Sequence, residues 1–396
     1  MLGLREKLLR SLLMSPILIG SFVGAARADF AGCVEQIKQE ASHNGVSSGL
    51  LSKAFSDVSP DPKVLDLENY QPEFKTPIWD YMASMVDDER VKDGKAAMSA
   101  NSKALALAEE RFGVSRYAVA AIWGVESDFG HQIGDRPLIQ SLATLACTAS
   151  KRPRYFRGEL MATLKIADRG DIPLDKLKGS WAGAFGQTQF MPSTFLRLAV
   201  DLDGSGRDII DNSAAALGST ANYLHKSGWR TGEGWIYEVK LPQGYSGPSG
   251  RRDKHPMSFW KGRGLTRMDG QALGEGSAGL LLPTGANGPA FLVTSNFDAI
   301  YSYNPSESYA LAVAILAHRL AGGSEIQTPW PTDDPGLSRA GRRELQELLV
   351  KRGYDVGTPD GVIGTKSHAA IAEIQGKNGM RADGRASQKV LDLLRQ

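Results

Sequence analysis

One glutamate closes an almost unbroken apolar run in the sequence, within the stretch AIWGVESDFG (residues 121–130). The residues before it, VAAIWGV, are apolar or small on every side of a helix, and such a helix is normally buried. Gly130 is a candidate C-cap, so Glu126 would lie near the negative end of the helix dipole. Burial and that dipole both disfavour a carboxylate and raise its pKa. Glu126 is therefore a candidate proton donor to a leaving oxygen.

Glu126 could equally have a structural role, with its carboxylate satisfied by an arginine or by backbone groups. Asp128 follows only two residues later. Residues two positions apart point to different faces of a helix, so these two carboxylates do not form an acid–base pair by spacing. The stretch therefore indicates one acid without a second carboxylate beside it.

A second candidate region is KGSWAGAFGQTQFMPSTF (residues 178–195). The glycines before its QTQ run allow the backbone to approach a ligand closely. Gln187 and Gln189 offer amides, while the tryptophan and the phenylalanines offer apolar surfaces. Amides beside aromatic faces suit the N-acetyl groups and ring faces of amino sugars. A Gly-rich segment that packs closely against a helix is the alternative interpretation.

These segments, followed by ANYLHKSGW (residues 221–229), resemble in the same order the lytic murein transglycosylases of the membrane-bound B type. The similarity extends from about Phe30 to Ala321. Separately, LQELLVKRGY, DGVIG and AIAEIQ near the C-terminus resemble the peptidoglycan-binding domain of three helices. The resemblance implies a mainly α (α+β) protein. We expect a lysozyme-like catalytic domain with a small β-containing part, followed by a small three-helix peptidoglycan-binding domain.

The resemblance also implies a reaction on peptidoglycan. In this family one glutamate protonates the glycosidic oxygen between N-acetylmuramic acid and N-acetylglucosamine. The same residue, now a base, takes the proton of the muramoyl C6 hydroxyl, which attacks C1 and closes a 1,6-anhydro ring. No water is consumed, so no second carboxylate is needed to position one, unlike in most glycosidases. A hydrolytic muramidase and a non-catalytic glycan-strand-binding protein are the alternatives.

The same motifs imply the site residues. Glu126 is the catalytic acid and base by its position in VESDFG. The residues that stand where the family contacts its substrate are Ser180, Gln189, Phe190, Met191, Tyr223, Tyr303, Tyr309, Tyr81 and Arg152. For the tyrosines, core packing is the alternative. Lys151 replaces the first of two family arginines, and a lysine lacks the bidentate geometry of an arginine.

The segment VDLDGSGRDIIDN resembles the first half of an EF-hand loop, and some relatives bind calcium there. Asp201, Asp203, Ser205 and the Arg207 carbonyl fit ligand positions, but Asn212 occupies the twelfth position in place of a bidentate glutamate. A turn held by Asx hydrogen bonds is the other interpretation. The histidines show no metal-ligand spacing. We therefore expect no cofactor and no catalytic metal, with weak calcium binding as the alternative.

The elements that must position these residues follow from the apolar periodicity. The chain is mainly helical in pattern from about residue 31 to 223, and Ser115 is a plausible N-cap for the helix RYAVAAIWGVES. A region rich in turn formers follows, with β-prone segments such as WIYEVKLPQGYSGPSG and PAFLVTSNFDAIYSYN. Helical character returns with SYALAVAILAHRLAG.

The sequence divides into four segments. Residues 1–28 have a basic start, a short apolar stretch and an Ala-Arg-Ala site, which together predict a cleaved signal peptide and a periplasmic protein. A membrane anchor is the alternative, but the apolar stretch is short for a bilayer. We predict the catalytic domain over 29–324, a Pro- and Gly-rich linker over 325–336, and the peptidoglycan-binding domain over 337–396.

The two cysteines enter further predictions. The segment FAGC, which ends at Cys33, loosely resembles a lipoprotein box but has Phe where Leu is usual. We therefore expect a soluble protein rather than one with a lipid on Cys33. Cys33 and Cys147 can pair in an exported chain, and closing so long a loop would contribute about 4–5 kcal/mol. Two buried free thiols are the alternative.

The charge balance bears on the partners. The chain carries 46 Lys and Arg against 44 Asp and Glu, a net charge of +2, so no overall field favours nucleic acid. The expected partner is the peptidoglycan glycan strand, with proteins of the cell-wall machinery as further candidates. The C-terminal domain should tether the enzyme to the wall and raise its local concentration there. We expect a monomer.

Overall fold

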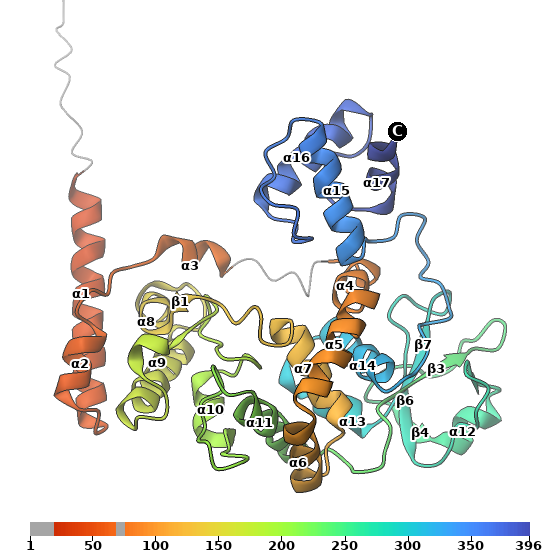
Figure 1. The fold of residues 1–396 in the computed structure, drawn as a ribbon, viewed down its shortest axis with the longest axis horizontal. Coiled ribbons are helices and arrows are strands. Elements are labelled where there is room, and N and C mark those ends of the chain that lie inside the picture. Colours follow the sequence, from red (N-terminus) through yellow and green to blue (C-terminus); the bar gives the residue numbers. More distant parts are fainter. Residues whose placement is uncertain (1–19, 69–75) are drawn as a thin grey trace, which may run out of the picture.

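The computed structural model describes residues 20–68 and 76–396 (Figure 1). These residues form two helical lobes, a part built on a small β-sheet, and a separate helical domain at the C-terminus. The expected mainly α fold with a small β-containing part is confirmed. Most of the predicted signal peptide (residues 1–28) lies outside the described residues, and its cleavage stays a prediction.

The first lobe combines N-terminal helices with helices from the middle of the chain. Its helices and short strands are α1 (Gly20–His43), α2 (Ser48–Ala54), α3 (Pro62–Leu67), β1 (Arg136–Pro137), α8 (Leu138–Thr148), α9 (Pro153–Asp168), the 3-10 helix Leu174–Lys176, β2 (Lys178–Gly179) and α10 (Pro192–Leu198). A disulfide joins Cys33 on α1 to Cys147 on α8, with 5.8 Å between the Cα atoms. The bond closes a separation of 114 residues, so it contributes about 4–5 kcal/mol through the entropy of the unfolded chain.

The second lobe contains the helix that carries Glu126. Its helices are α4 (Ile78–Met85), α5 (Asp88–Ala100), α6 (Ser102–Phe112), α7 (Arg116–Ser127), α11 (Ser213–Lys226), α13 (Ser295–Tyr303) and α14 (Glu307–Leu320). Ser115 caps α7 as predicted, since its side chain accepts a hydrogen bond from the Tyr117 amide. Helix α11 links the lobes because Ala216 packs in the first core and Leu217 in the second.

The sheet follows α11 in the chain. Its strands are β3 (Ile236–Lys240), β4 (Lys254–Pro256), β5 (Thr266–Arg267), β6 (Ser277–Leu281) and β7 (Ala290–Val293), and helix α12 (Met257–Gly262) lies after β4. The strands are antiparallel in the order β4-β6-β7-β3-β5. Phe291 packs in the core of the second lobe, whereas Leu292 packs with Trp260 of α12. Neighbouring side chains on a strand point to opposite faces, so the sheet is covered on both sides.

The C-terminal domain has its own core. It contains α15 (Arg339–Lys351), α16 (Thr365–Lys377) and α17 (Gln388–Arg395), whose inward residues include Leu345, Ile371 and Leu391. Figure 1 shows this domain lying over α4.

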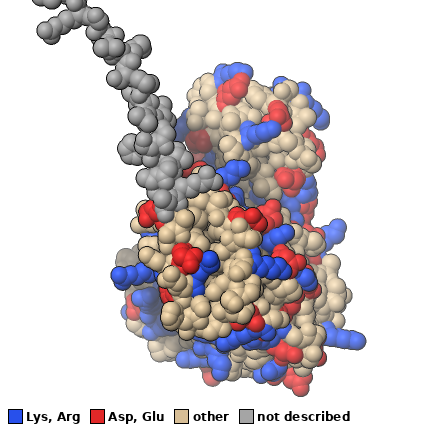
Figure 2. Space-filling model, turned by 90° about the vertical axis from the view of Figure 1, so that its left-hand side faces the viewer, with Lys and Arg blue, Asp and Glu red and all other residues tan. Residues whose placement is uncertain are grey.

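Charged side chains are mixed on the surface. On the face seen in Figure 2, Lys and Arg are interspersed with Asp and Glu, in keeping with the small net charge. Among the described residues, no helix has the length and apolar character needed to cross a bilayer.

Candidate active site

The end of the Glu126 helix differs from the prediction. The C-cap of α7 is Asp128 in the left-handed region (φ 51°), followed by Phe129 (φ 58°) and Gly130 (φ 89°). The prediction that Gly130 caps the helix is therefore wrong. Aspartate tolerates this conformation better than most residues, and the Phe129 ring anchors the turn by packing edge-on against Trp123, 5.7 Å between centroids.

The Glu126 carboxylate meets a phenol from α14. The Tyr309 hydroxyl donates a 2.6 Å hydrogen bond to Glu126 Oε1. Tyr309 is fully buried, and Glu126 is partly buried. Burial raises the pKa of the Tyr309 phenol well above its usual range, and the nearby Glu126 charge raises it further. The phenol therefore stays protonated at neutral pH and remains a hydrogen-bond donor to the carboxylate.

Three aromatic rings lie together where the two lobes meet. The centroids of Tyr223 and Tyr303 are 4.7 Å apart, and Phe190 is 6.1 Å from the first ring and 5.9 Å from the second. Both tyrosines pack against the cores of both lobes. The Tyr303 hydroxyl donates to the Thr188 carbonyl (2.7 Å), and burial, with the Glu126 charge second, raises the pKa of Tyr303 well above its usual range. This cluster therefore lies close to Glu126.

The Gly-rich segment closes back on itself and on α7. Phe185 and Phe190 exchange backbone hydrogen bonds, so the four intervening residues GQTQ (186–189) form a tight hairpin loop. The Ser127 hydroxyl donates to the Gln187 carbonyl, which joins this loop to the residue after Glu126. Gln189 adopts φ 51° and donates its side-chain amide to the Ile133 and Gly186 carbonyls.

Three other predicted substrate residues, Tyr81, Ser180 and Met191, come from different parts of the fold. Tyr81 is buried on α4 and contributes to the raised pKa of Tyr309, so it belongs to the same cluster. Ser180 is partly exposed, and its hydroxyl oxygen accepts from the Ala184 amide (3.0 Å). Met191 is the partly exposed N-cap residue of α10.

Arg152 lies in the first lobe, away from the helix of Glu126. It is the N-cap residue of α9, and its guanidinium lies over the rings of Tyr155 (5.5 Å) and Phe156 (5.7 Å). The neighbouring Lys151 amide donates to Glu68. The structure therefore gives Arg152 aromatic partners on its own helix.

Sequence reasoning missed the arginines that hold Asp128. Arg90 on α5 is 3.6 Å from Asp128 Oδ1 and also donates to the Gly124 carbonyl of α7. Arg339, from the C-terminal domain, donates to Asp128 Oδ1 at 2.9 Å. Arg90 lies in the polar sequence DERVKDGKAAMSA, which resembles any solvated helix. No local pattern could have indicated either partner.

Comparison with known families decides the relationship of this chain. Residues 29–318 match the family described as the Transglycosylase SLT domain, and residues 338–394 match the putative peptidoglycan binding domain. The chain belongs to the SLT transglycosylase family.

Individual relatives refine the assignment of this SLT transglycosylase. The membrane-bound lytic murein transglycosylase B of Escherichia coli (strain K12) is 33% identical over 242 residues, which are 61% of this chain and 66% of that protein. SltB3 from Pseudomonas aeruginosa, solved in complex with NAG-anhNAM-pentapeptide, is 42% identical with a TM-score of 0.74, covering 93% of this chain and 99% of that one. The sequence-based assignment to the type B lytic transglycosylases is confirmed.

A third relative bears on the EF-hand-like segment. Slt35 of Escherichia coli, solved in complex with calcium, is 30% identical with a TM-score of 0.64, over 73% of this chain and 92% of that one. In the present protein, Asp201 accepts a hydrogen bond from the Gly204 amide (2.7 Å), and Asp203 accepts one from the Ser205 amide (3.2 Å). Asn212 caps α11 with its side-chain oxygen.

The loop thus lacks the bidentate carboxylate of an EF-hand. Arg207, whose carbonyl was a predicted ligand, directs its guanidinium to Asp171. Across the part of the chain that the structure describes, no group of three or more His, Cys, Asp or Glu could hold a metal ion. The residues of this loop do not fit a full calcium site.

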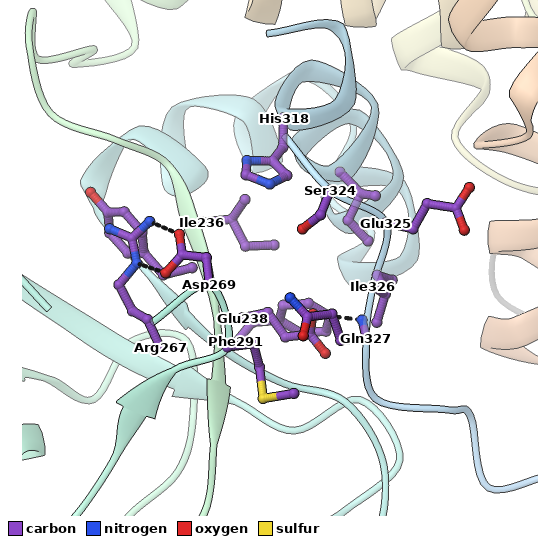
Figure 3. Close-up of a pocket in the computed structure, with 13 residues that line it drawn as sticks. Ile236, Glu238, Arg267, Asp269, Phe291, His318, Ser324, Glu325, Ile326 and Gln327 are labelled. Atoms are coloured by element: carbon purple, nitrogen blue, oxygen red, sulfur yellow. Dashed lines mark hydrogen bonds and ion pairs between the residues drawn. The ribbon is translucent and has the colours of Figure 1, made fainter. Parts of the chain in front are cut away.

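The SLT transglycosylase also has a small cavity remote from the Glu126 end of α14. It lies between β3, β5 and the other end of that helix, and its volume is about 40 Å³ (Figure 3). His318 and the Arg267–Asp269 ion pair line it, and burial lowers the pKa of His318. It has room for a few waters but not for a sugar ring.

Proposed function

We propose that this protein cleaves the β-1,4 bond between N-acetylmuramic acid and N-acetylglucosamine without water, leaving 1,6-anhydro-N-acetylmuramoyl ends. The observation that carries the proposal is the hydrogen bond from Tyr309 to Glu126, in a chain of the SLT transglycosylase family. The SltB3 relative was solved with an anhydro-sugar peptide, at 42% identity over 93% of this chain. That likeness supports the same product here.

Glu126 acts as acid and then as base in this mechanism. It first gives its proton to the glycosidic oxygen, and the bond to muramoyl C1 breaks with oxocarbenium character. The resulting carboxylate is held by the Tyr309 hydroxyl, which stays protonated because burial raises its pKa. The carboxylate then takes the proton of the C6 hydroxyl as that oxygen bonds to C1. The nucleophile is part of the substrate, so no bimolecular encounter with water is needed.

The neighbouring carboxylate supports a mechanism with one acid. Asp128 is bound to Arg339 at 2.9 Å and lies 3.6 Å from Arg90. A glycosidase that activates water or forms a covalent intermediate needs a second carboxylate across the scissile bond. Asp128 is directed to the arginines instead.

The predicted substrate residues differ in the kind of contact that each can make with a sugar. Both amide hydrogens of Gln189 are used by backbone carbonyls, so its Oε1 is the group that can accept from a sugar. The Ser180 oxygen accepts from Ala184, which leaves the hydroxyl proton to donate. Met191 supplies partly exposed apolar surface. The tyrosine and phenylalanine cluster supplies aromatic surface where the two lobes meet.

We further propose export to the periplasm through a signal peptide at residues 1–28, action as a monomer, and peptidoglycan strands as the ligand of both domains. The mechanism uses no metal or organic cofactor. Proteins of the cell-wall machinery are candidate partners.

Mass spectrometry of digested peptidoglycan tests the reaction. The wild-type protein should release muropeptides with anhydro ends, which are lighter than hydrolysed ends by one water. Hydrolysed ends would show a muramidase, and no release with retained binding would show a glycan-binding protein.

A further inference from the structure

The C-terminal domain is attached to the catalytic body by ion pairs. The start of α15 faces the acidic first turns of α5: the Arg339 amide donates to Asp87 (2.8 Å), its guanidinium lies 3.3 Å from Asp93, and Arg343 pairs with Glu89. The charges are complementary, and Arg385, which precedes α17, adds a further ion pair to Asp80 of α4. The domain therefore docks in a defined orientation.

The segment between the domains is also held in place. Glu238 of β3 accepts hydrogen bonds from the backbone amides of Gln327 (2.9 Å) and Thr328 (2.8 Å). Ile326 and Trp330 pack against the core of the second lobe. Flexible linkers lack such contacts, so this segment fixes the domain rather than leaving it on a loose tether.

Arg339 reaches beyond the interface to the turn that follows Glu126. Its Nη2 lies 2.9 Å from Asp128 Oδ1, and each of the two side chains is only 16% exposed. Arg90 approaches the same carboxylate oxygen from α5. Asp128 is thus held between one guanidinium of the catalytic body and one of the C-terminal domain.

The turn held in this way is strained. Asp128, Phe129 and Gly130 have positive φ in succession, and the bulky side chain of Phe129 disfavours this region more than aspartate or glycine does. Such a conformation persists only where its surroundings impose it. The ion pairs of Asp128 and the packing of Phe129 are those surroundings. The turn begins two residues after Glu126, so it fixes the end of the helix from which that carboxylate projects.

We propose that Arg339 is a positioning residue for catalysis, which acts through Asp128 on the orientation of Glu126. The proposal rests on the assignment of Glu126 as the acid and base. It makes the docked C-terminal domain part of the catalytic apparatus, whereas the sequence indicated only a tether. Small displacements of a reacting group cost up to about 100-fold in rate, so the contact has room for a measurable effect.

The test uses full-length variants and a soluble, uncrosslinked glycan oligosaccharide. Arg339→Ala should lower kcat about 10-fold with KM within about 2-fold of wild type, and Arg339→Lys should recover part of the loss. The matched control is Arg343→Ala, which removes the neighbouring interdomain ion pair to Glu89 but no contact to Asp128. The control should leave kcat and KM unchanged.

A double-mutant cycle shows whether Asp128 carries the effect. Adding Arg339→Ala to Asp128→Asn should lower kcat by less than 2-fold further, because the pair is already broken. Retention of Arg339→Ala on sacculi should match that of Arg343→Ala.

Three results would overturn the proposal: wild-type kcat in Arg339→Ala, an equal loss of kcat in Arg343→Ala, or additive effects in the cycle. The proposed function fails separately, through hydrolysed ends from the wild type or an active Glu126→Gln protein.

Discussion

The two sides of the end of α7 have opposite chemistry. On one side Glu126 meets the Tyr309 phenol, with Tyr303 and Tyr81 close by. On the other side, two residues later, Asp128 lies between Arg90 and Arg339. Phenols with raised pKa values stay neutral at pH 7, whereas the guanidiniums are charged.

The difference shows how one helix end supports two tasks. A carboxylate that accepts a hydrogen bond from a neutral phenol can lose and regain a proton while it keeps that donor, which suits an acid and base. A carboxylate between guanidiniums is fixed in place by charge, which suits a support for a strained turn. We therefore expect changes on the phenol side to alter chemistry and changes on the guanidinium side to alter geometry and stability.

The largest effect should come from exchanging each carboxylate for its amide. Glu126→Gln should lower the release of anhydro-muropeptides by about 10²–10⁴-fold while binding to sacculi and the free energy of unfolding stay near wild type. Asp128→Asn should retain more activity but lose about 1–3 kcal/mol of stability, because two partly buried guanidiniums lose their counter-charge. Muropeptide mass spectrometry measures the activity of each variant, and urea unfolding measures its stability. Equal losses of activity and stability in the two variants would contradict the comparison.

The packing beneath the turn offers the next test. A Cβ added at Gly124 would lie 2.6 Å from Phe129 Cζ and 3.3 Å from Leu316 Cδ2. Gly124→Ala should therefore destabilise the protein by about 1–3 kcal/mol through overpacking. Gly158→Ala on α9 is the control, since its Cβ would meet nothing within 4 Å; it should stabilise by up to about 1 kcal/mol. Urea unfolding should show a loss of stability in Gly124→Ala and a gain in Gly158→Ala. Stability changes of the same sign would argue against overpacking as the cause.

Removing the phenol oxygen should have a smaller effect on rate. Tyr309→Phe deletes the donor to Glu126 and should lower kcat about 10-fold, the equivalent of about 1.4 kcal/mol for a hydrogen bond to a charged group. The limb of the pH–kcat profile that reports Glu126 should move to higher pH, because a donor to the carboxylate favours its charged form. Tyr245→Phe, which removes a hydroxyl bonded to the Pro248 carbonyl in the sheet part, should leave both unchanged. An unmoved profile in Tyr309→Phe would show that the phenol does not act on Glu126.

The smallest expected effect is that of His318, which lies in the last turn of α14 and lines the cavity of Figure 3. Burial lowers the pKa of His318, so below about pH 6.5 the unfolded state binds a proton that the folded state resists. The free energy of unfolding should therefore fall from pH 7.5 to 5.5, by under about 1 kcal/mol for this residue, since the side chain is partly exposed. His318→Gln should have a shallower decline in urea unfolding. Equal declines in the free energy of unfolding of the wild type and His318→Gln would show that His318 does not contribute to the pH dependence of stability.

Features set by neighbouring residues could be predicted from the sequence. Ser115 caps α7 because its side chain reaches the Tyr117 amide two residues on. The burial of most of α7 follows from the apolar and small residues of the helix itself. The fold class and the separate C-terminal core follow from periodicity and from the family resemblance.

Features set by residues far apart in the chain could not be predicted from the sequence. The partner of Glu126 is 183 residues away in the chain, and the partner of Asp128 in the C-terminal domain is 211 residues away. The helix was expected to end at a glycine, yet it ends at Asp128, because long-range ion pairs and the packing of Phe129 outweigh the local preference.

The sequence by itself thus determined the candidate acid, its helix and the Gly-rich loop, because short-range hydrogen bonds and apolar spacing are written in adjacent residues. Only the tertiary structure decided which neighbours Glu126 has, where its helix stops, and that the C-terminal domain holds the strained turn. Those choices depend on the energy of contacts between segments that meet only when the chain is folded.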